Sequence, residues 1–121
     1  MSIKLVYCLT RKEGLTREQF QDYWLNKHAP LVESVKHLMG MKRYVQSHTY
    51  ESDMGRAARA ARGGGEPYDG VMEGWLDSEE QATAALTEES LAALQLLLDD
   101  EGRFIDFDRS RIFFTREHVI Y

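Results

Sequence analysis

The fold is decided by residues 3–40, which read IKLVYCLTRKEGLTREQFQDYWLNKHAPLVESVKHLMG. In residues 3–10 apolar side chains occupy every second position, which is typical of a strand. Val6 and Cys8 make the second face partly apolar too, so we predict a strand buried on both sides. After a turn at 11–14, Thr16 and Gln19 have the spacing of a capping box. The apolar positions that follow recur at helical spacing on one arc of about 120°. They are Phe20, Trp24, His28, Leu31, Val32, Val35 and Leu38.

This helix should kink at Pro30, because proline lacks a backbone N–H and disfavours helical geometry at the residue before it. We expect the helix to resume to about Leu38 and to end at Gly40. Alternating segments then predict three further strands, and Ser78, followed by Thr87, predicts the start of a second helical region. The predicted strands are 41–50, 68–77 and 111–115.

The predicted order is therefore βαββαβ, an α+β ferredoxin-like arrangement in which two helices cover one face of an antiparallel sheet. We expect one domain over residues 1–121, with a long, mobile and solvated connection at 51–67 and an arm at 116–121. Nothing in so short a chain would cover the second face of the sheet. A homodimer that pairs sheet to sheet is therefore predicted.

Composition narrows the class of protein. The 121 residues suffice for one domain, and a net charge of −5 argues against a nucleic-acid partner, which requires a basic face. The acidic stretch 69–75 also differs from the basic, aromatic strand of an RNA recognition motif. No apolar run reaches the ~20 residues of a membrane span. With the single cysteine, Cys8, no internal disulfide forms, so we expect a cytoplasmic protein.

Several motifs resemble the EthD family of dimeric α+β barrel proteins. They are Phe20-x-x-Tyr23-Trp24-x-x-x-His28-x-Pro30, Arg43-Tyr44-Val45-Gln46-Ser47-His48, Pro67-Tyr68-Asp69-Gly70-Val71 running into Trp75, and Arg103-Phe104-Ile105-Asp106 leading to Glu117-His118. The resemblance spans residues 3 to 119. It implies a ferredoxin-like subunit that pairs into a barrel, with a ligand cavity between each sheet and its helices. Similar folds include cofactor-free monooxygenases, haem-degrading enzymes, muconolactone isomerases and polyketide cyclases, and fold alone does not choose among them.

His28 is the sharpest chemical signal, because a histidine within an apolar arc needs a hydrogen-bond partner. The kink at Pro30 suggests the carbonyl of Asn26 as that partner, and a buried structural histidine is as good an interpretation as a cavity acid or base. Tyr44, Gln46 and His48 form a second candidate, a polar row on one strand face. Such a row would bind an oxygenated ligand through imidazole, phenol and amide, or would face water or a partner.

Other candidates are weaker. Trp24, Tyr68 and Trp75 are predicted to line an aromatic pocket, although large aromatic residues are more often core. Glu73 could serve as a base and the arginine run 56–62 as an anion-binding lid, but solvated roles are favoured for both. No histidine or acidic set has metal-ligand spacing, and no nucleotide motif occurs, so no cofactor and no metal are predicted.

Two functions remain open at this stage. The first is a cofactor-independent or partner-dependent enzyme, monooxygenase-like or modifying aromatic products, of oxidative or aromatic catabolism. It would bind a small hydrophobic or aromatic molecule, with His28 and His48 as catalytic residues and Trp24, Tyr44, Gln46, Tyr68 and Trp75 binding substrate. The alternative is a non-catalytic dimeric carrier or an accessory subunit of a partner oxygenase. A haem-binding relative ranks last.

Overall fold

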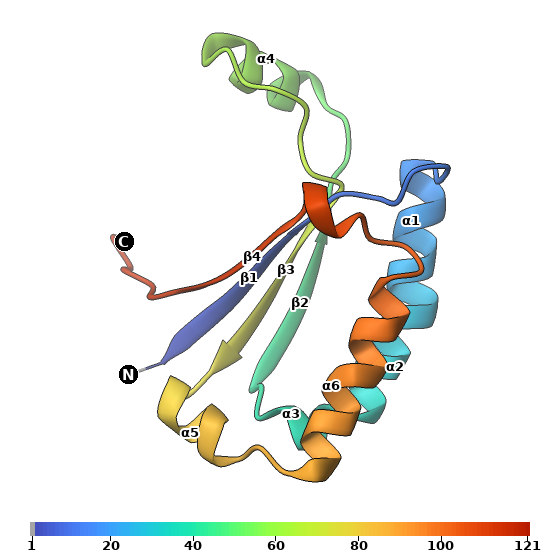
Figure 1. Ribbon diagram of the computed structural model, residues 1–121. Helices are drawn as coiled ribbons and strands as arrows, with labels where there is room; N and C mark the ends of the chain where they lie inside the picture. The colour runs from blue at the N-terminus through green and yellow to red at the C-terminus, as the bar shows by residue number, and fades with distance from the viewer. Residues whose placement is uncertain (1) are drawn as a thin grey trace.

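The computed structural model describes residues 2–121, which form a four-stranded antiparallel sheet with helices against one face (Figure 1). The sheet order is β2-β3-β1-β4, so the first and third strands are central. The arrangement confirms the ferredoxin-like βαββαβ prediction, including the position of each predicted strand. The strands are β1 (Ile3–Leu9), β2 (Arg43–His48), β3 (Gly70–Leu76) and β4 (Arg111–Thr115).

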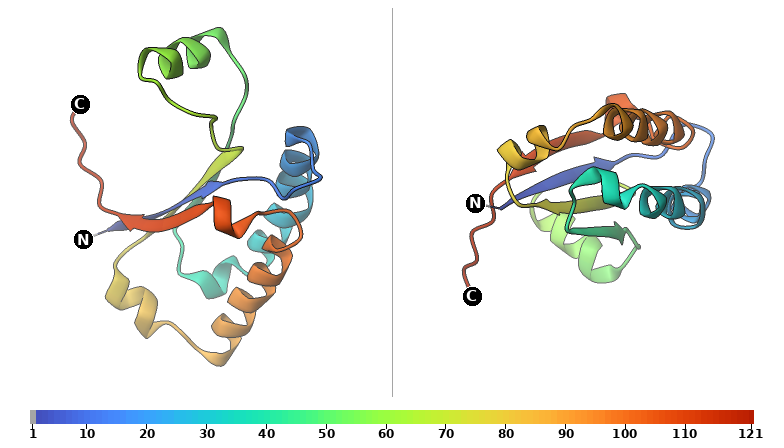
Figure 2. Two further views of the ribbon diagram at one scale, coloured as in Figure 1. Left: turned by 45° about the horizontal axis from the view of Figure 1, so that its top comes forward. Right: turned by 90° about the horizontal axis from the view of Figure 1, so that it is seen from below.

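The helices form two groups that lie side by side over one face of the sheet (Figures 1 and 2). One group follows β1 and the other follows β3, and Figure 2 shows α6 lying beside α1 and α2. Their predicted starts are confirmed, because the side chains of Thr16, Ser78 and Thr87 each accept a backbone N–H three residues later. The elements are α1 (Arg17–Tyr23), η1 (Trp24–His28), α2 (Ala29–Ser34), α3 (Lys36–Met39), α5 (Glu79–Ala84), α6 (Glu88–Glu101) and η2 (Phe107–Arg109).

The kink predicted at Pro30 takes the form of a π turn. In η1 the N–H of Ala29 donates to the carbonyl of Trp24, five residues earlier instead of four. Pro30 is the second residue of α2, in the first turn, where its missing N–H costs nothing. One extra residue is thereby inserted into the helix between Trp24 and His28.

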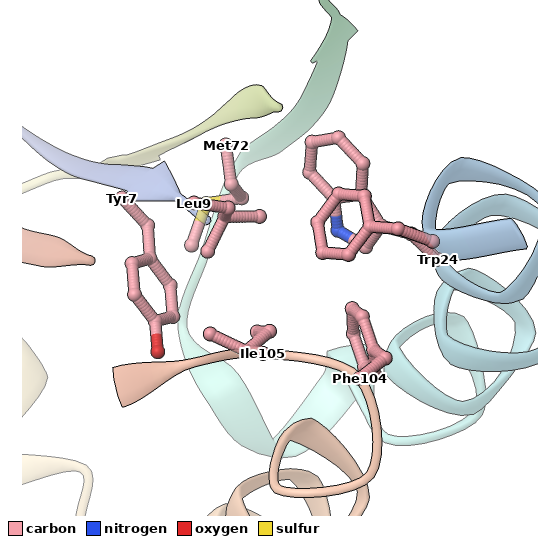
Figure 3. Packing of buried hydrophobic residues seen from close by; sticks show 7 residues of the cluster. Tyr7, Leu9, Trp24, Met72, Phe104 and Ile105 are labelled. Carbon is pink, nitrogen blue, oxygen red and sulfur yellow. The ribbon is translucent and has the colours of Figure 1, made fainter. Parts of the chain in front are cut away.

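The core lies between the sheet and the helices (Figure 3). Tyr7, Leu9 and Met72 project from β1 and β3 toward the helix layer, where they meet aromatic side chains. The ring centroid of Phe20 lies 5.6 Å from that of Trp24 and 5.5 Å from that of Phe104. Burial of these large apolar surfaces is the main force that holds the helices on the sheet.

The prediction of a mobile, solvated connection at 51–67 is wrong for its first half. A helix, α4 (Asp53–Ala61), begins after Ser52, whose hydroxyl accepts the N–H of Gly55. Alanine is the best helix former, and Arg56 pairs with Asp53 one turn earlier at 2.6 Å, so the segment forms a helix while exposed. Figure 1 shows α4 projecting from the body of the subunit, beyond the end of the sheet.

The second face of the sheet carries no helix from the described residues (Figure 2). It combines apolar side chains with the Lys4–Glu73 ion pair of the two central strands, and Phe113 leaves 46% of its surface exposed there. The C-terminal residues 116–121 form no strand, and Glu117 accepts the indole N–H of Trp75 on this face at 2.9 Å. None of the helices within residues 2–121 combines the length and apolar character that a bilayer span requires. The apolar residues of this face are Val6, Cys8, Val45, Val71 and Phe113.

Candidate functional site

A cavity of about 260 Å³ lies between the helix-facing side of the sheet and the helices. Its walls are mainly apolar and come from both layers. Within them lie His28 from η1, Tyr7 from β1, Tyr44 from β2 and Glu101 from the end of α6. Three cationic residues also belong to the lining: Lys36, Lys42 and Arg43. Apolar walls with a small number of polar groups are typical of a pocket for a small organic molecule.

His28 is buried beside this cavity, with 5% of its surface exposed. Its Nδ1 lies 2.8 Å from Oδ2 of Asp100 on α6, and Oδ1 of the same carboxylate accepts the hydroxyl of Tyr23 at 2.6 Å. The prediction that the Asn26 carbonyl would serve as partner is wrong. The π turn leaves the imidazole facing α6, where a side-chain carboxylate is a stronger acceptor than a backbone carbonyl.

The charge states of this pair fix the tautomer of His28. Burial opposes ionisation of Asp100, but hydrogen bonds from Tyr23 and His28 outweigh it and lower the pKa of Asp100. An ionised carboxylate only accepts hydrogen bonds, so Nδ1 of His28 carries the proton and Nε2 has a free lone pair. Burial lowers the pKa of His28 although Asp100 opposes the shift, so the imidazole is neutral at neutral pH.

Nε2 of His28 is open to the cavity. Within residues 2–121 no polar atom forms a hydrogen bond with Nε2, whereas every side-chain nitrogen or oxygen of those residues that solvent cannot reach has a partner. Nε2 is therefore accessible, and His28 lines the cavity. His28 can therefore accept a proton from a molecule bound there.

The polar row of β2 lies on the helix-facing side of the sheet, because Gln46 pairs with the buried Met72 of β3. Its members are joined by hydrogen bonds. The Gln46 side-chain amide donates to the Tyr44 hydroxyl at 3.0 Å and to the Trp24 carbonyl at 3.0 Å, and its oxygen lies 2.8 Å from Nε2 of His48. The Tyr44 hydroxyl thus accepts from Gln46 and keeps its own proton free to donate.

The two predicted catalytic histidines do not come together. His48 stacks on the outer side of the Trp24 ring, with 4.6 Å between ring centroids and 22° between ring planes. It belongs to a separate shallow hollow with Leu25 and Ala29, and burial lowers its pKa. Trp24 therefore separates His48 from the cavity of His28, and of the polar row only Tyr44 reaches that cavity.

The three predicted pocket aromatics are divided among different surfaces. Trp24 lines the cavity and is 1% exposed, and its ring lies against the backbone at Gly70. The prediction that Trp75 lines this cavity is wrong, because strand alternation places it on the helix-free face under the guanidinium of Arg43. Tyr68 also lies outside the cavity, in a polar hollow near the start of α1, because it precedes β3.

The remaining acidic and histidine candidates are outside the cavity too. Asp69 is 2% exposed and accepts the N–H and guanidinium of Arg11 and the guanidinium of Arg17, which makes it an anchor between loops. Glu73 pairs with Lys4 at 2.8 Å on the helix-free face. His37 and His118 are exposed, as predicted. Within residues 2–121 no three His, Cys, Asp or Glu side chains are grouped to hold a metal ion.

Sequence reasoning missed Asp100 and Glu101, which look only like the end of a helix. A signal was present: negative charge is unfavourable at a helix C-terminus, where the last carbonyls already carry partial negative charge. Asp99, Asp100 and Glu101 all occupy that position of α6. Two of them are drawn into the site, one as the partner of His28 and the other as part of the cavity wall.

Comparison with known proteins agrees with this architecture. The EthD domain matches residues 12–108, most of the chain. The search of curated proteins found no match for this chain. Among solved structures, an EthD family protein from Bacillus halodurans C-125 aligns with a TM-score of 0.63 and 20% identity, covering 98% of this chain and 100% of that one.

Two further solved structures extend the comparison. A dimeric ferredoxin-like protein of unknown function from Thermobifida fusca YX aligns with a TM-score of 0.60 and 12% identity, over 95% of this chain and 90% of that one. SnoaB from Streptomyces nogalater, a cofactor-independent oxygenase whose structure is that of a point mutant, aligns with a TM-score of 0.53 and 12% identity, over 98% and 96%. Identities this low establish the shared fold and nothing finer.

Proposed function

The chain belongs to the EthD domain family, and within it we propose that this protein is an acid–base enzyme that removes a proton from a small, largely apolar molecule. The observation that carries the proposal is the His28–Asp100 pair beside the cavity, with Nδ1 and Oδ2 2.8 Å apart. A neutral imidazole oriented by a carboxylate is the arrangement of a general base.

The proposed reaction begins when a carbon or oxygen acid binds against the apolar walls. Nε2 of His28 takes the proton, and the electron pair of the broken bond remains on the substrate as an enolate or phenolate. Asp100 stabilises the imidazolium that forms, and the Tyr23 hydroxyl keeps Asp100 in place. The Tyr44 hydroxyl, whose proton is free, donates to the substrate oxygen as negative charge develops there.

Oxygenation is one outcome that this chemistry permits. An electron-rich carbanion can transfer an electron to O2 without a cofactor, and conversion of a CH2 group to a carbonyl with O2 releases one water. SnoaB, a cofactor-independent oxygenase, shares the fold. We therefore propose that oxygenation follows the deprotonation, which would make the protein a monooxygenase-type oxidoreductase of aromatic catabolism. His48 is assigned no proton transfer in it, since Trp24 separates it from the cavity.

The alternative is a non-catalytic carrier or accessory subunit of a partner oxygenase. The mainly apolar cavity walls favour it, because they would hold a hydrophobic molecule without any chemistry. In both versions we propose a homodimer, since no helix covers the apolar residues of the helix-free face and a protein of this fold is described as dimeric. A cytoplasmic setting is proposed from the single unpaired Cys8.

Hydrogen–deuterium exchange at carbon tests the proposal. The probe is 2-tetralone, a neutral bicyclic α-aryl ketone whose C1–H is acidic because it lies between the ring and the carbonyl. We expect the protein to accelerate exchange at C1 in D2O, measured by NMR, and His28→Gln to reduce that acceleration by roughly 10²–10⁴-fold. His37→Gln, at an exposed histidine, is the control and should match the wild type. Equal rates for all three proteins, with binding intact, would favour the carrier.

A further inference from the structure

We propose that Glu101 is a second catalytic group that donates a hydrogen bond to a carbonyl oxygen of the bound molecule, so that the ligand class is a neutral α-aryl ketone. This inference rests on the proposed function, because it names the substrate chemistry of the same cavity. Nothing in the roles given to His28 and Asp100 uses Glu101, although all belong to one site.

The position of Glu101 follows from the helix that carries it. Consecutive residues of a helix point about 100° apart. Asp100 is turned toward His28, and the next residue, Glu101, is turned into the cavity, where it lines the wall together with Tyr7 and Tyr44. The end of α6 therefore supplies a carboxylate to hold the base from behind and a second carboxyl group that faces the ligand.

No cation forms an ion pair with Glu101, although Lys36, Lys42 and Arg43 line the same cavity. Within residues 2–121 no Lys, Arg or His nitrogen lies within ion-pair distance of the Glu101 carboxyl group, and Tyr7 lines the cavity beside it. Tyr7 is 8% exposed, and Figure 3 shows its ring extending from β1 toward the helix layer. Glu101 is half-buried, and placing an unpaired carboxylate against apolar side chains is costly, which favours the neutral form of the group.

The pKa of Glu101 agrees with this geometry. Burial raises it to about 7, with nearby Asp100 adding to the shift and the Tyr7 hydrogen bond opposing it. Burial and the carboxyl group together raise the pKa of Tyr7, which therefore stays a donor. The ionisable groups that share the cavity or adjoin Glu101 are Tyr7 from β1, His28 from η1, Lys36 from α3, Lys42, Arg43 and Tyr44 from the start of β2, and Asp100 from α6.

A neutral carboxyl group has one proton to donate. Because Glu101 lines the cavity, a ligand bound there can accept that proton in a hydrogen bond. A ketone oxygen placed there receives hydrogen bonds from Glu101 and from the free hydroxyl of Tyr44. An acid kept neutral by its apolar site can stabilise an enolate oxygen in this way.

The step balances without any further reactant. The C–H bond next to the carbonyl breaks, and its proton goes to Nε2 of His28. The electron pair forms a C=C bond, and the π electrons of the carbonyl move to oxygen. That oxygen is stabilised by the Glu101 and Tyr44 donors, and transfer of the Glu101 proton to it gives a neutral enol. Return of the two protons in the opposite order regenerates the protein groups.

Binding of a matched pair of probes tests the role of Glu101 without any turnover. 2-Tetralone and tetralin have the same bicyclic frame, and only the first has a carbonyl oxygen. Dissociation constants are measured by NMR titration in the His28→Gln protein at about pH 6 and about pH 8, one unit on each side of the Glu101 pKa. The His28→Gln background removes both the titration and the chemistry of the imidazole.

We expect 2-tetralone to bind about tenfold more tightly at the lower pH, because the protonated fraction of Glu101 changes by that factor, while tetralin shows no such change. In the same His28→Gln protein, a second substitution Glu101→Gln, whose amide still donates, should make ketone binding independent of pH. Glu101→Leu, which cannot donate, should instead remove the preference for ketone over tetralin. Glu89→Gln, an exposed position of the same helix, is the control for a lost carboxylate.

The inference would be overturned by ketone binding that is equal at both pH values, by a pH dependence that survives Glu101→Gln, or by no preference for ketone over tetralin at the lower pH. These results are separate from the test of the proposed function. If His28→Gln abolishes C1 exchange while Glu101→Leu leaves rate and ketone binding unchanged, only the role of Glu101 fails. If the wild type exchanges no faster than His28→Gln, the acid–base function fails while the binding result still stands.

Discussion

Nδ1 of His28 lies 2.8 Å from Oδ2 of Asp100, a residue 72 positions later in the chain. The contact joins the helical segment after β1 to the end of α6, the two groups of helices that cover the sheet. It joins a buried imidazole to a half-buried carboxylate on the other group, so it exists only once both groups have docked. The site is therefore a product of tertiary packing, and its chemistry depends on that packing.

Replacing Asp100 by Asn should lower the pKa of His28 further below its ordinary value of about 6.5. Asp100 is the only influence that raises this pKa against burial, and Asn carries no charge to do so. The amide can also present its N–H₂ to Nδ1, which would favour the tautomer that blocks Nε2. NMR titration of the imidazole measures the shift, and C1 exchange of 2-tetralone should fall with it. An upward shift would show that Asp100 does not act on His28 as described.

Replacing Glu101 by Gln should stabilise the fold at alkaline pH. The pKa of Glu101 rises from 4.5 to about 7 on folding, so the folded state binds more protons and the wild type loses stability as pH rises across that interval. At about 1.4 kcal/mol per pH unit, the loss reaches about 3 kcal/mol above pH ~7. Urea unfolding of wild type and variant at about pH 4 and about pH 8 should therefore show a gain at the higher pH alone. Glu89→Gln should show no such gain.

Gly70→Ala should destabilise the protein by about 1–3 kcal/mol. A Cβ at this position would overlap the Trp24 ring and would lie 2.9 Å from the backbone oxygen of Ser47, neither of which can move freely in the core. Gly74→Ala is the matched control in the same strand, because its Cβ would meet only the flexible end of Met41. Thermal unfolding compares them, and a similar loss in both variants would contradict this account of Trp24 packing.

Val6→Glu should separate the proposed homodimer into monomers. Val6 lies at the centre of the helix-free face, opposite Phe113 on β4, so a carboxylate there would be buried between two sheets. Sedimentation equilibrium should give a dimer mass for the wild type and a mass near 14.0 kDa for the variant. Leu91→Glu, on the exposed side of α6, should remain dimeric. A monomeric wild type at micromolar concentration would rule out the barrel arrangement.

Much of the fold was predictable because its signals are local. Strand alternation places β1, β2, β3 and β4, and side-chain caps at Thr16 and Thr87 mark helix starts within one residue. The prediction failed for α4, because its arginines and the three glycines that follow it at 63–65 suggested a mobile loop. Local alanine propensity and the Ser52 cap outweighed that composition.

The candidate site was only half predictable. His28 could be found because it interrupts an apolar arc, which is a property of one helix. Its partner Asp100 could not, since nothing in a single sequence states how two helices will face each other. Trp75 was misplaced because alternation divides a strand into two faces without saying which one carries the helices.

The π turn of η1 makes this part of the chain intolerant of changes in length. Trp24, which closes the cavity toward β2, and His28, which faces Asp100, are set at their relative angle by the one extra residue between them. Deleting any residue there would restore ordinary helical spacing and turn one of the two by about 100°. The connection that holds α4 projects freely and can gain or lose residues, so insertions and deletions should accumulate there and be absent between Trp24 and His28.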